Sequence, residues 1–114
     1  MQTNLQTWLN ATIVSKVVYG FSFQSVRPHL ECNDGTTLSV QASESHYCTP
    51  RVNGKPDGGY TSVEVWCCST TEGMTAEWAE YQSGDDPWAF LPVALVEKYV
   101  DFHGGINWKK YGLE

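Results

Sequence analysis

The sequence is short of basic residues, since seven Lys and Arg stand against thirteen Asp and Glu, and its 114 residues carry a formal net charge of −6. A negative surface repels the phosphate backbone of nucleic acids and anionic lipid headgroups. The composition therefore disfavours a nucleic-acid coat or a membrane-surface protein. An acidic face that imitates nucleic acid toward a protein partner stays open, beside the simpler interpretation that the charge keeps the protein soluble.

Long apolar runs are also missing. No stretch approaches the roughly 18 apolar residues that a membrane span requires. Residues 1–10 lack the basic start and the apolar run of a signal peptide. These absences predict a cytoplasmic protein, in which the four cysteines are expected to be reduced thiols. A disulfide between the adjacent Cys67 and Cys68 would in addition be strained.

Motifs of the common enzyme classes are absent. The sequence has no Gly-rich phosphate loop after a strand, no Walker pattern and no Gly-x-Ser-x-Gly elbow. No spacing of Asp or Glu residues predicts a pair of carboxylates placed for acid–base catalysis. Repeats, low-complexity tracts and linkers are missing too. One domain over residues 1–114 therefore accounts for the chain, and an apolar content of 41% is enough for one core.

Apolar and polar residues alternate over residues 37–43 and 60–67, and this pattern predicts two half-buried strands. The Gly- and Pro-rich residues 53–59 between them predict a mobile tip. The residues expected on the core side are Leu38, Val40, Ala42, Thr61, Val63, Val65 and Cys67, and those on the opposite side are Ser39, Gln41, Ser43, Tyr60, Ser62, Glu64 and Trp66.

Other segments complete the pattern. A helix is expected near residues 3–12, a strand within 13–23 and a short segment near 29–32. In the last third, Thr75 can cap a short helical segment, and a longer helix is expected from Pro92 to a cap at Gly104 or Gly105. The predicted fold class is α+β, a small antiparallel sheet with two or three helices packed on it.

The loop between the two middle strands carries the candidate binding residues. It contains Arg51, one of two arginines in the chain, and a guanidinium suits a phosphate while aromatic rings stack bases. Equally open is the interpretation that Arg51 pairs with a surface carboxylate and that the aromatic residues belong to the core or to an interface. The residues predicted to bind a ligand are Arg51, Tyr47, His46, Tyr60, Trp88 and Phe90.

Two other kinds of chemistry use the same loop. Cys48 and His46 could be a nucleophile and its base, but no third group is evident to orient the histidine, so a packing cysteine and a hydrogen-bonded histidine are expected. His29, Cys32, His46 and Cys48 offer zinc ligands at spacings that match no recognised finger. His103 is expected to cap a helix. The sequence thus predicts no catalytic residue, no metal and no cofactor.

At these residues the chain resembles a family of small proteins found in phage and prophage genomes. The resemblance covers residues 38–106, and its most specific part is the His-Tyr-Cys-x-Pro-Arg run at 46–51. The other matching blocks are Val40-Gln41-Ala42-Ser43, Gly59-Tyr60-Thr61-Ser62-Val63-Glu64, Leu91-Pro92 and His103-Gly104-Gly105-Ile106. Residues 53–59 and 66–68 depart from the pattern.

The family is similar to the anti-Thoeris sponge proteins, which hold cyclic ADP-ribose signals of bacterial TIR enzymes in recessed pockets of an oligomer without cleaving them. The resemblance implies a phage anti-defence protein, not an enzyme, that sequesters a cyclic nucleotide in the cytoplasm of the infected bacterium. It also implies that Arg51 contacts phosphate and that Tyr47, Tyr60 and residues 88–90 contact base or ribose.

Partners follow from the same considerations. Five tryptophans offer more large apolar surface than one modest core hides, so a homo-oligomer is expected. The alternative function is an anti-CRISPR-like inhibitor that binds a bacterial defence protein directly through acidic and aromatic surface. A third interpretation is an enzyme that uses Cys48. Neither membrane association nor direct nucleic-acid binding is expected.

Overall fold

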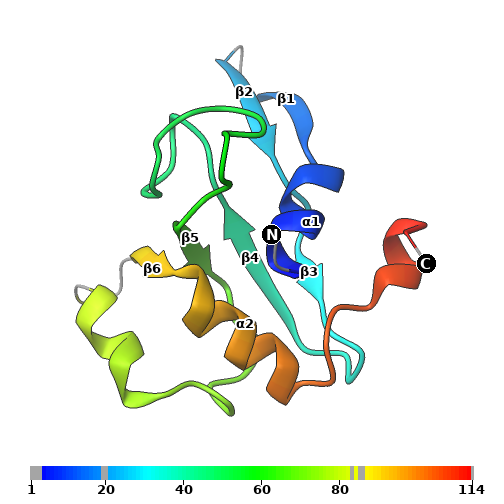
Figure 1. The fold of residues 1–114 in the computed structure, drawn as a ribbon, viewed down its shortest axis with the longest axis vertical. Helices are drawn as coiled ribbons and strands as arrows, with labels where there is room; N and C mark the ends of the chain where they lie inside the picture. The colour runs from blue at the N-terminus through cyan, green and yellow to red at the C-terminus, as the bar shows by residue number, and fades with distance from the viewer. Residues whose placement is uncertain (1–3, 19–20, 83, 85–86, 114) are drawn as a thin grey trace.

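A four-stranded antiparallel sheet forms the centre of the fold, in a computed structural model that describes residues 4–18, 21–82, 84 and 87–113. Figure 1 shows the sheet, whose strand order β3-β4-β5-β6 follows the sequence. The strands are β3 (Leu30–Glu31), β4 (Thr37–Gln41), β5 (Ser62–Trp66) and β6 (Trp88–Pro92). The predicted α+β class, a small antiparallel sheet with a few helices, is confirmed.

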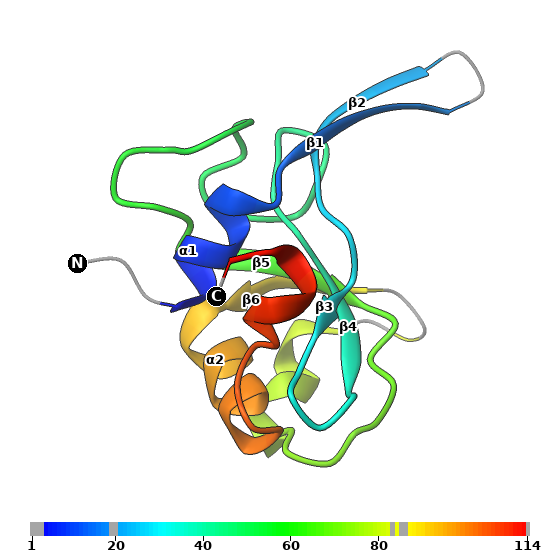
Figure 2. The ribbon, with the colours of Figure 1, turned by 90° about the vertical axis from the view of Figure 1, so that its right-hand side faces the viewer.

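A helix and a hairpin precede the sheet. The helix α1 (Asn4–Ala11) is the one predicted for residues 3–12, and it ends where the Thr12 hydroxyl donates a hydrogen bond to the Trp8 carbonyl at 2.8 Å. The strand expected within residues 13–23 is in fact two, β1 (Val14–Val18) and β2 (Phe21–Val26), which pair antiparallel. Figure 2 shows that this hairpin projects from the body as an arm.

The last third is helical, as predicted. The 3₁₀ helix η1 (Ala76–Tyr81) follows Thr75, but the Thr75 side chain makes no capping hydrogen bond. The helix α2 (Val93–Phe102) begins directly after Pro92, and Gly105 N donates to Val100 O at 2.9 Å to close its end. A further 3₁₀ helix, η2 (Trp108–Tyr111), was not predicted. Among the described residues, no helix is both long and apolar enough to cross a bilayer.

The core is one cluster of buried side chains contributed by both helices, η1 and the sheet. Burial of these apolar groups is the main term that stabilises the fold. The cluster is built around Leu5, Trp8 and Leu9 of α1, Leu38 and Val40 of β4, Val63 and Val65 of β5, Leu91 of β6, Trp78 of η1 and Val96, Tyr99 and Val100 of α2. The residues that alternation placed on the core side of β4 and β5 are therefore buried, apart from the ends of the predicted strands.

Both predicted strands differ from expectation near their ends. Thr61 was expected on the core side but is exposed, and Ser62 was expected on the opposite side but is buried. Cys67 was expected on the core side, but β5 ends at Trp66, and Cys67 is exposed with a positive φ of 55°. Gln41 and Ser43 were expected on the open side, yet both are buried. Gln41 is buried because its side chain exchanges hydrogen bonds of 2.9 and 2.7 Å with the Arg27 backbone, a distant partner that the alternating pattern does not predict.

Arg27 itself joins three segments that are distant in sequence. The Arg27-Pro28 pair is typical of a turn, but the Arg27 side chain is only 2% exposed. Its Nε donates to Leu9 O in the last turn of α1 at 2.9 Å, and its Nη1 donates to Ala42 O at 2.5 Å. The guanidinium also lies 5.6 Å from the centroid of the Tyr60 ring. Backbone carbonyls and an aromatic face thus surround this buried cation.

Candidate ligand-binding site

The loop that carries the predicted site leaves β4 and then returns to pair with the same neighbouring strand. Gln41 pairs with Glu64 of β5, and after the excursion Thr49 forms a bridge with Ser62 of β5. Thr49 N donates to Ser62 O at 3.2 Å. Residues 43–48 are therefore anchored to β5 at both ends, so that a rigid strand fixes the position of this loop.

Ser43, His46 and Cys48 hold the inside of the loop together. The Ser43 hydroxyl lies 2.6 Å from His46 Nδ1. Cys48 Sγ lies 3.2 Å from Ser43 O and 3.3 Å from Pro50 O, and either carbonyl can accept its one S–H hydrogen. Burial lowers the pKa of His46 and raises the pKa of Cys48. A nucleophilic thiol needs a lowered pKa and an exposed, electropositive setting. This environment instead favours a protonated thiol that packs and donates hydrogen bonds.

On the outside of the loop, Arg51, Tyr47 and Phe90 form a row of neighbouring flat groups, which we call the aromatic row. The Arg51 guanidinium carbon lies 5.3 Å from the Tyr47 ring centroid, within the range of a cation–π contact. The Tyr47 and Phe90 centroids lie 5.8 Å apart at an interplanar angle of 47°. Tyr47 is 50% and Phe90 43% exposed. These are the three predicted site residues that the structure brings together at the surface.

Backbone contacts hold the two rings in place. Tyr47 N donates to Glu64 Oε2 at 3.1 Å, and Phe90 N donates to Tyr47 O at 3.0 Å. The register between β5 and β6 shifts by one residue around Glu64, and Phe90 in this bulge has a positive φ of 53°. A bulge re-aims a side chain, and a left-handed backbone is unusual for a bulky residue. The bulge therefore turns Phe90 toward solvent, where it meets Tyr47.

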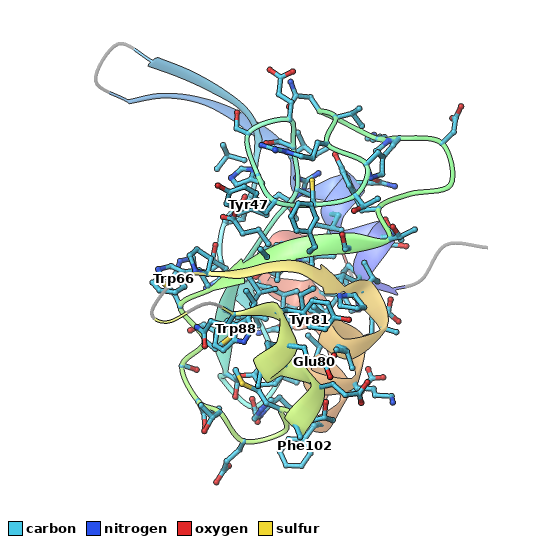
Figure 3. The ribbon with its side chains drawn as sticks, turned by 90° about the vertical axis from the view of Figure 1, so that its left-hand side faces the viewer. Tyr47, Trp66, Glu80, Tyr81, Trp88 and Phe102 are labelled. Atoms are coloured by element: carbon cyan, nitrogen blue, oxygen red, sulfur yellow. The ribbon has the colours of Figure 1, made fainter. Side chains whose placement is uncertain are left out.

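The aromatic row borders a groove of about 600 Å³ that runs along β6, the last strand of the sheet. In Figure 3, the labelled Tyr47 lies on one side of β6 while Tyr81 and Glu80 lie on the other. Pockets of a few hundred Å³ are typical of small-molecule sites. The groove is lined by Tyr47, Glu80, Tyr81, Gln82, Pro87, Ala89 and Phe90.

Sequence reasoning missed the η1 side of this groove. Glu80 resembles any solvated acidic residue, and Tyr81 fits a helical spacing, so neither stands out in the sequence. Their place beside the loop depends on the packing of η1 against β6, a tertiary contact that no local pattern encodes.

Three predicted site residues do not reach the groove. His46 is occupied inside the loop, as described above. Tyr60 is 1% exposed, and its hydroxyl donates to Val52 O at 2.7 Å, so its ring is part of the core. Trp88 pairs with Val65 on the core side of the sheet and meets Trp78 edge-on at 5.4 Å. These three residues therefore fit the alternative interpretation, in which the two aromatic side chains pack in the core and His46 forms a hydrogen bond inside the loop.

His103 belongs to a second polar cluster, at the C-terminal end of α2. It is the C-cap residue of α2, as predicted, and it is 3% exposed. Its Nδ1 lies 2.7 Å from Asp34 Oδ2, and its Nε2 lies 2.7 Å from Glu72 O. Burial lowers the pKa of His103, but its hydrogen bonds to Asp34 and Glu72 outweigh this effect and raise it. The cluster thus ties the end of α2 to two loops.

Metal ligands are not gathered anywhere in the described part of the chain. Within it, no three His, Cys, Asp or Glu side chains lie close enough together to hold a metal ion. Cys32, one of the residues considered for zinc, is fully buried, and burial raises the pKa of its thiol to about 12. Such a thiol is a poor source of the thiolate that zinc requires.

A second depression, of about 520 Å³, lies between α1 and the C-terminal segment. Its one charged lining residue is Lys109, and it lacks the contact between a cation and an exposed aromatic ring that marks the first groove. Its lining residues are Thr7, Ala11, Asn33, Ile106, Asn107, Trp108, Lys109 and Leu113. The groove along β6 is therefore the stronger candidate site.

Comparison of the chain with protein-family models, with curated proteins and with solved structures gives no match. The candidate site is therefore defined by the geometry of its own residues.

Proposed function

We propose that this protein captures a cyclic nucleotide of the cyclic ADP-ribose type without cleaving it, as a phage anti-defence protein in the cytoplasm of an infected bacterium. One observation carries the proposal: an exposed guanidinium lies against the exposed Tyr47 ring, which together with the neighbouring Phe90 ring lines a ligand-sized groove. The resemblance of residues 46–51 to phage proteins supports the biological setting.

The groups in the row match the parts of a nucleotide. Stacking on an aromatic ring contributes about 1–3 kcal/mol per base. A hydrogen bond from a charged group contributes roughly 1.5–3 kcal/mol. Among the described residues, Arg51 donates a single long side-chain hydrogen bond, of 3.3 Å, to Glu44 O. Its guanidinium can therefore turn toward a phosphate without losing a strong contact.

The interior of the loop supports capture rather than cleavage. Cys48 is 1% exposed, and its thiol lies within hydrogen-bond distance of two carbonyl oxygens, Ser43 O and Pro50 O. Within the described residues, no hydrogen bond links it to His46. A protonated, buried thiol does not attack a ligand that lies on the outer surface of the loop.

Arg51→Ala tests the proposal directly. We expect affinity for the captured nucleotide to fall at least about tenfold, because one charge-assisted phosphate contact is lost. Lys55→Ala is the matched control, since Lys55 is also exposed, lies in the same connection and carries the same charge. Arg27 cannot serve as a control because it is buried. Calorimetry that finds equal binding by the parent and both variants would place the site elsewhere.

The nature of the activity is tested with the parent protein. The protein is incubated with a panel of cyclic nucleotides and then denatured by heat, and the released material is analysed by chromatography. Release of intact ligand supports capture. Release of hydrolysed ligand contradicts it and favours an enzyme. Absence of any ligand favours direct inhibition of a protein.

Direct binding to a bacterial defence protein is the second candidate function, and one observation favours it. Trp66 shares a face of β5 with Glu64, on which Tyr47 is anchored, so Trp66 and Tyr47 lie on the same side of the sheet. Trp66 is 40% exposed. Exposed aromatic residues on an acidic protein are typical of an interface. Trp66→Ala would weaken such binding while leaving nucleotide capture at the groove unchanged.

A further inference from the structure

A free carboxylate lies on the side of the groove opposite the loop. Glu80 is exposed and lines the groove with Tyr81. Among the described residues, its side-chain carboxylate makes no hydrogen bond or ion pair. Figure 3 shows Glu80 across β6 from Tyr47, and Arg51 lies against Tyr47. The groove therefore has the Glu80 carboxylate on one side and, on the other, the Tyr47 ring, against which Arg51 lies outside the lining of the groove.

The Glu80 carboxylate inside the groove orients a nucleotide. A carboxylate repels phosphate, so the phosphate must lie toward Arg51 and the base toward Glu80. An ionised carboxylate only accepts hydrogen bonds, so it favours the base whose edge offers the most donors. Guanine presents its N1–H and its exocyclic amino group side by side, which matches the two oxygens of a carboxylate. Adenine offers one amino group, and uracil offers one N–H flanked by two carbonyl oxygens.

We propose that Glu80 determines the base specificity of the groove and that it selects guanine. This inference rests on the proposed capture of a cyclic nucleotide, and it places guanine where cyclic ADP-ribose has adenine. A good pair of hydrogen bonds to a base edge discriminates by about tenfold or more. We therefore expect a ligand with guanine to bind at least about tenfold more tightly than one with adenine, and a uracil ligand to bind most weakly.

The test measures affinities by calorimetry for cyclic di-GMP, cyclic di-AMP, cyclic di-UMP and cyclic ADP-ribose. The variant is Glu80→Gln, which keeps the size of the side chain but turns one acceptor into a donor. The control is Glu77→Gln, because Glu77 is exposed in the first turn of the same 3₁₀ helix and does not line the groove. Thermal melts check that both variants are folded, and such surface changes are expected to cost within about 0.5 kcal/mol.

The outcomes separate this inference from the proposed function. Preference of the parent for cyclic di-GMP, lost in Glu80→Gln and kept in Glu77→Gln, supports it. Equal affinities of the parent for the guanine and adenine ligands overturn it. An unchanged preference in Glu80→Gln also overturns it, while weaker binding by Arg51→Ala would leave the proposed function standing. If none of the four ligands binds the parent, the proposed function and the role of Glu80 both fail.

Discussion

Replacement of Arg27 by alanine is expected to destabilise the protein far more than replacement of Arg51, although both residues lie in connections between strands. Arg27 Nε and Nη1 donate to Leu9 O and Ala42 O, and the side chain is 2% exposed. Arg51 is exposed and donates one hydrogen bond of 3.3 Å. The two substitutions remove the same chemical group from opposite environments.

The magnitude follows from the groups that Arg27→Ala leaves behind. Each buried carbonyl that loses its donor costs about 1–3 kcal/mol. Loss of the contact with the Tyr60 ring adds about 1 kcal/mol. Removing a buried cation also recovers part of its desolvation cost, which acts in the opposite direction. The net expectation is a loss of about 3 kcal/mol in the free energy of unfolding, against about 0.5 kcal/mol for Arg51→Ala.

Urea titrations followed by tryptophan fluorescence measure both values, with far-UV circular dichroism as a second probe of the same transition. Thermal melts should show a fall in Tm of about 12 °C for Arg27→Ala, at about 4 °C per kcal/mol for a domain of this size. A loss below about 1 kcal/mol would refute the reasoning. It would mean that water or a local rearrangement satisfies the two carbonyl oxygens as well as the guanidinium does.

Four further outcomes are expected. Raising the pH from about 6 to 9 should lower the free energy of unfolding. The pKa of His103 is raised in the folded state, so the contact of protonated His103 with Asp34 stabilises the fold below the usual pKa of 6.5, and this stabilisation is lost as the pH rises through the folded-state pKa. The same pH dependence in His103→Gln would contradict this. At low pH, hydrogen bonds from the Thr36 backbone N–H and hydroxyl, and then from His103, lower the pKa of Asp34 to about 2. The stabilisation that ionised Asp34 supplies is therefore lost as the pH falls from the usual pKa of 3.8 toward about 2. Cys48→Ser should keep ligand capture and cost about 1 kcal/mol, since a hydroxyl can still donate to Ser43 O; a folded variant without activity would favour a nucleophilic role. Light scattering should give an oligomer mass at micromolar concentration, and a monomer would count against the expected self-association.

Local patterns predict much of this fold because they report burial on one face of an element. The alternation around Val40 and Val63 predicts two central strands, and Pro92 with Gly105 brackets α2. The same patterns are silent on partners that are distant in sequence. Arg27 resembles a surface turn residue because nothing near it in sequence indicates that the Leu9 and Ala42 carbonyls converge on its side chain.

The candidate site could be predicted only where its parts are local. Arg51 and Tyr47 lie four residues apart in one loop, so their contact follows from a turn. Phe90 reaches Tyr47 through a bulge that no glycine marks, and the sequence offers no signal for its positive φ. Tyr60 was grouped with the site because it follows the same loop, but alternation at a strand end does not reveal that its ring turns into the core.

The two outer strands of the sheet bear on how the protein behaves at high concentration. Exposed strand edges are templates for edge-to-edge aggregation, which bulges, prolines and covering segments prevent. On β6, the bulge at Phe90 and the terminal Pro92 interrupt the regular row of backbone donors and acceptors. The edge of β3 is covered, because Asn107 N donates to Glu31 O at 2.9 Å and Ile106 forms a bridge with Cys32. Residues 106–107 therefore cover the backbone edge of β3. Removing the chain from Ile106 onward would expose this edge to pairing with other strands and so to aggregation.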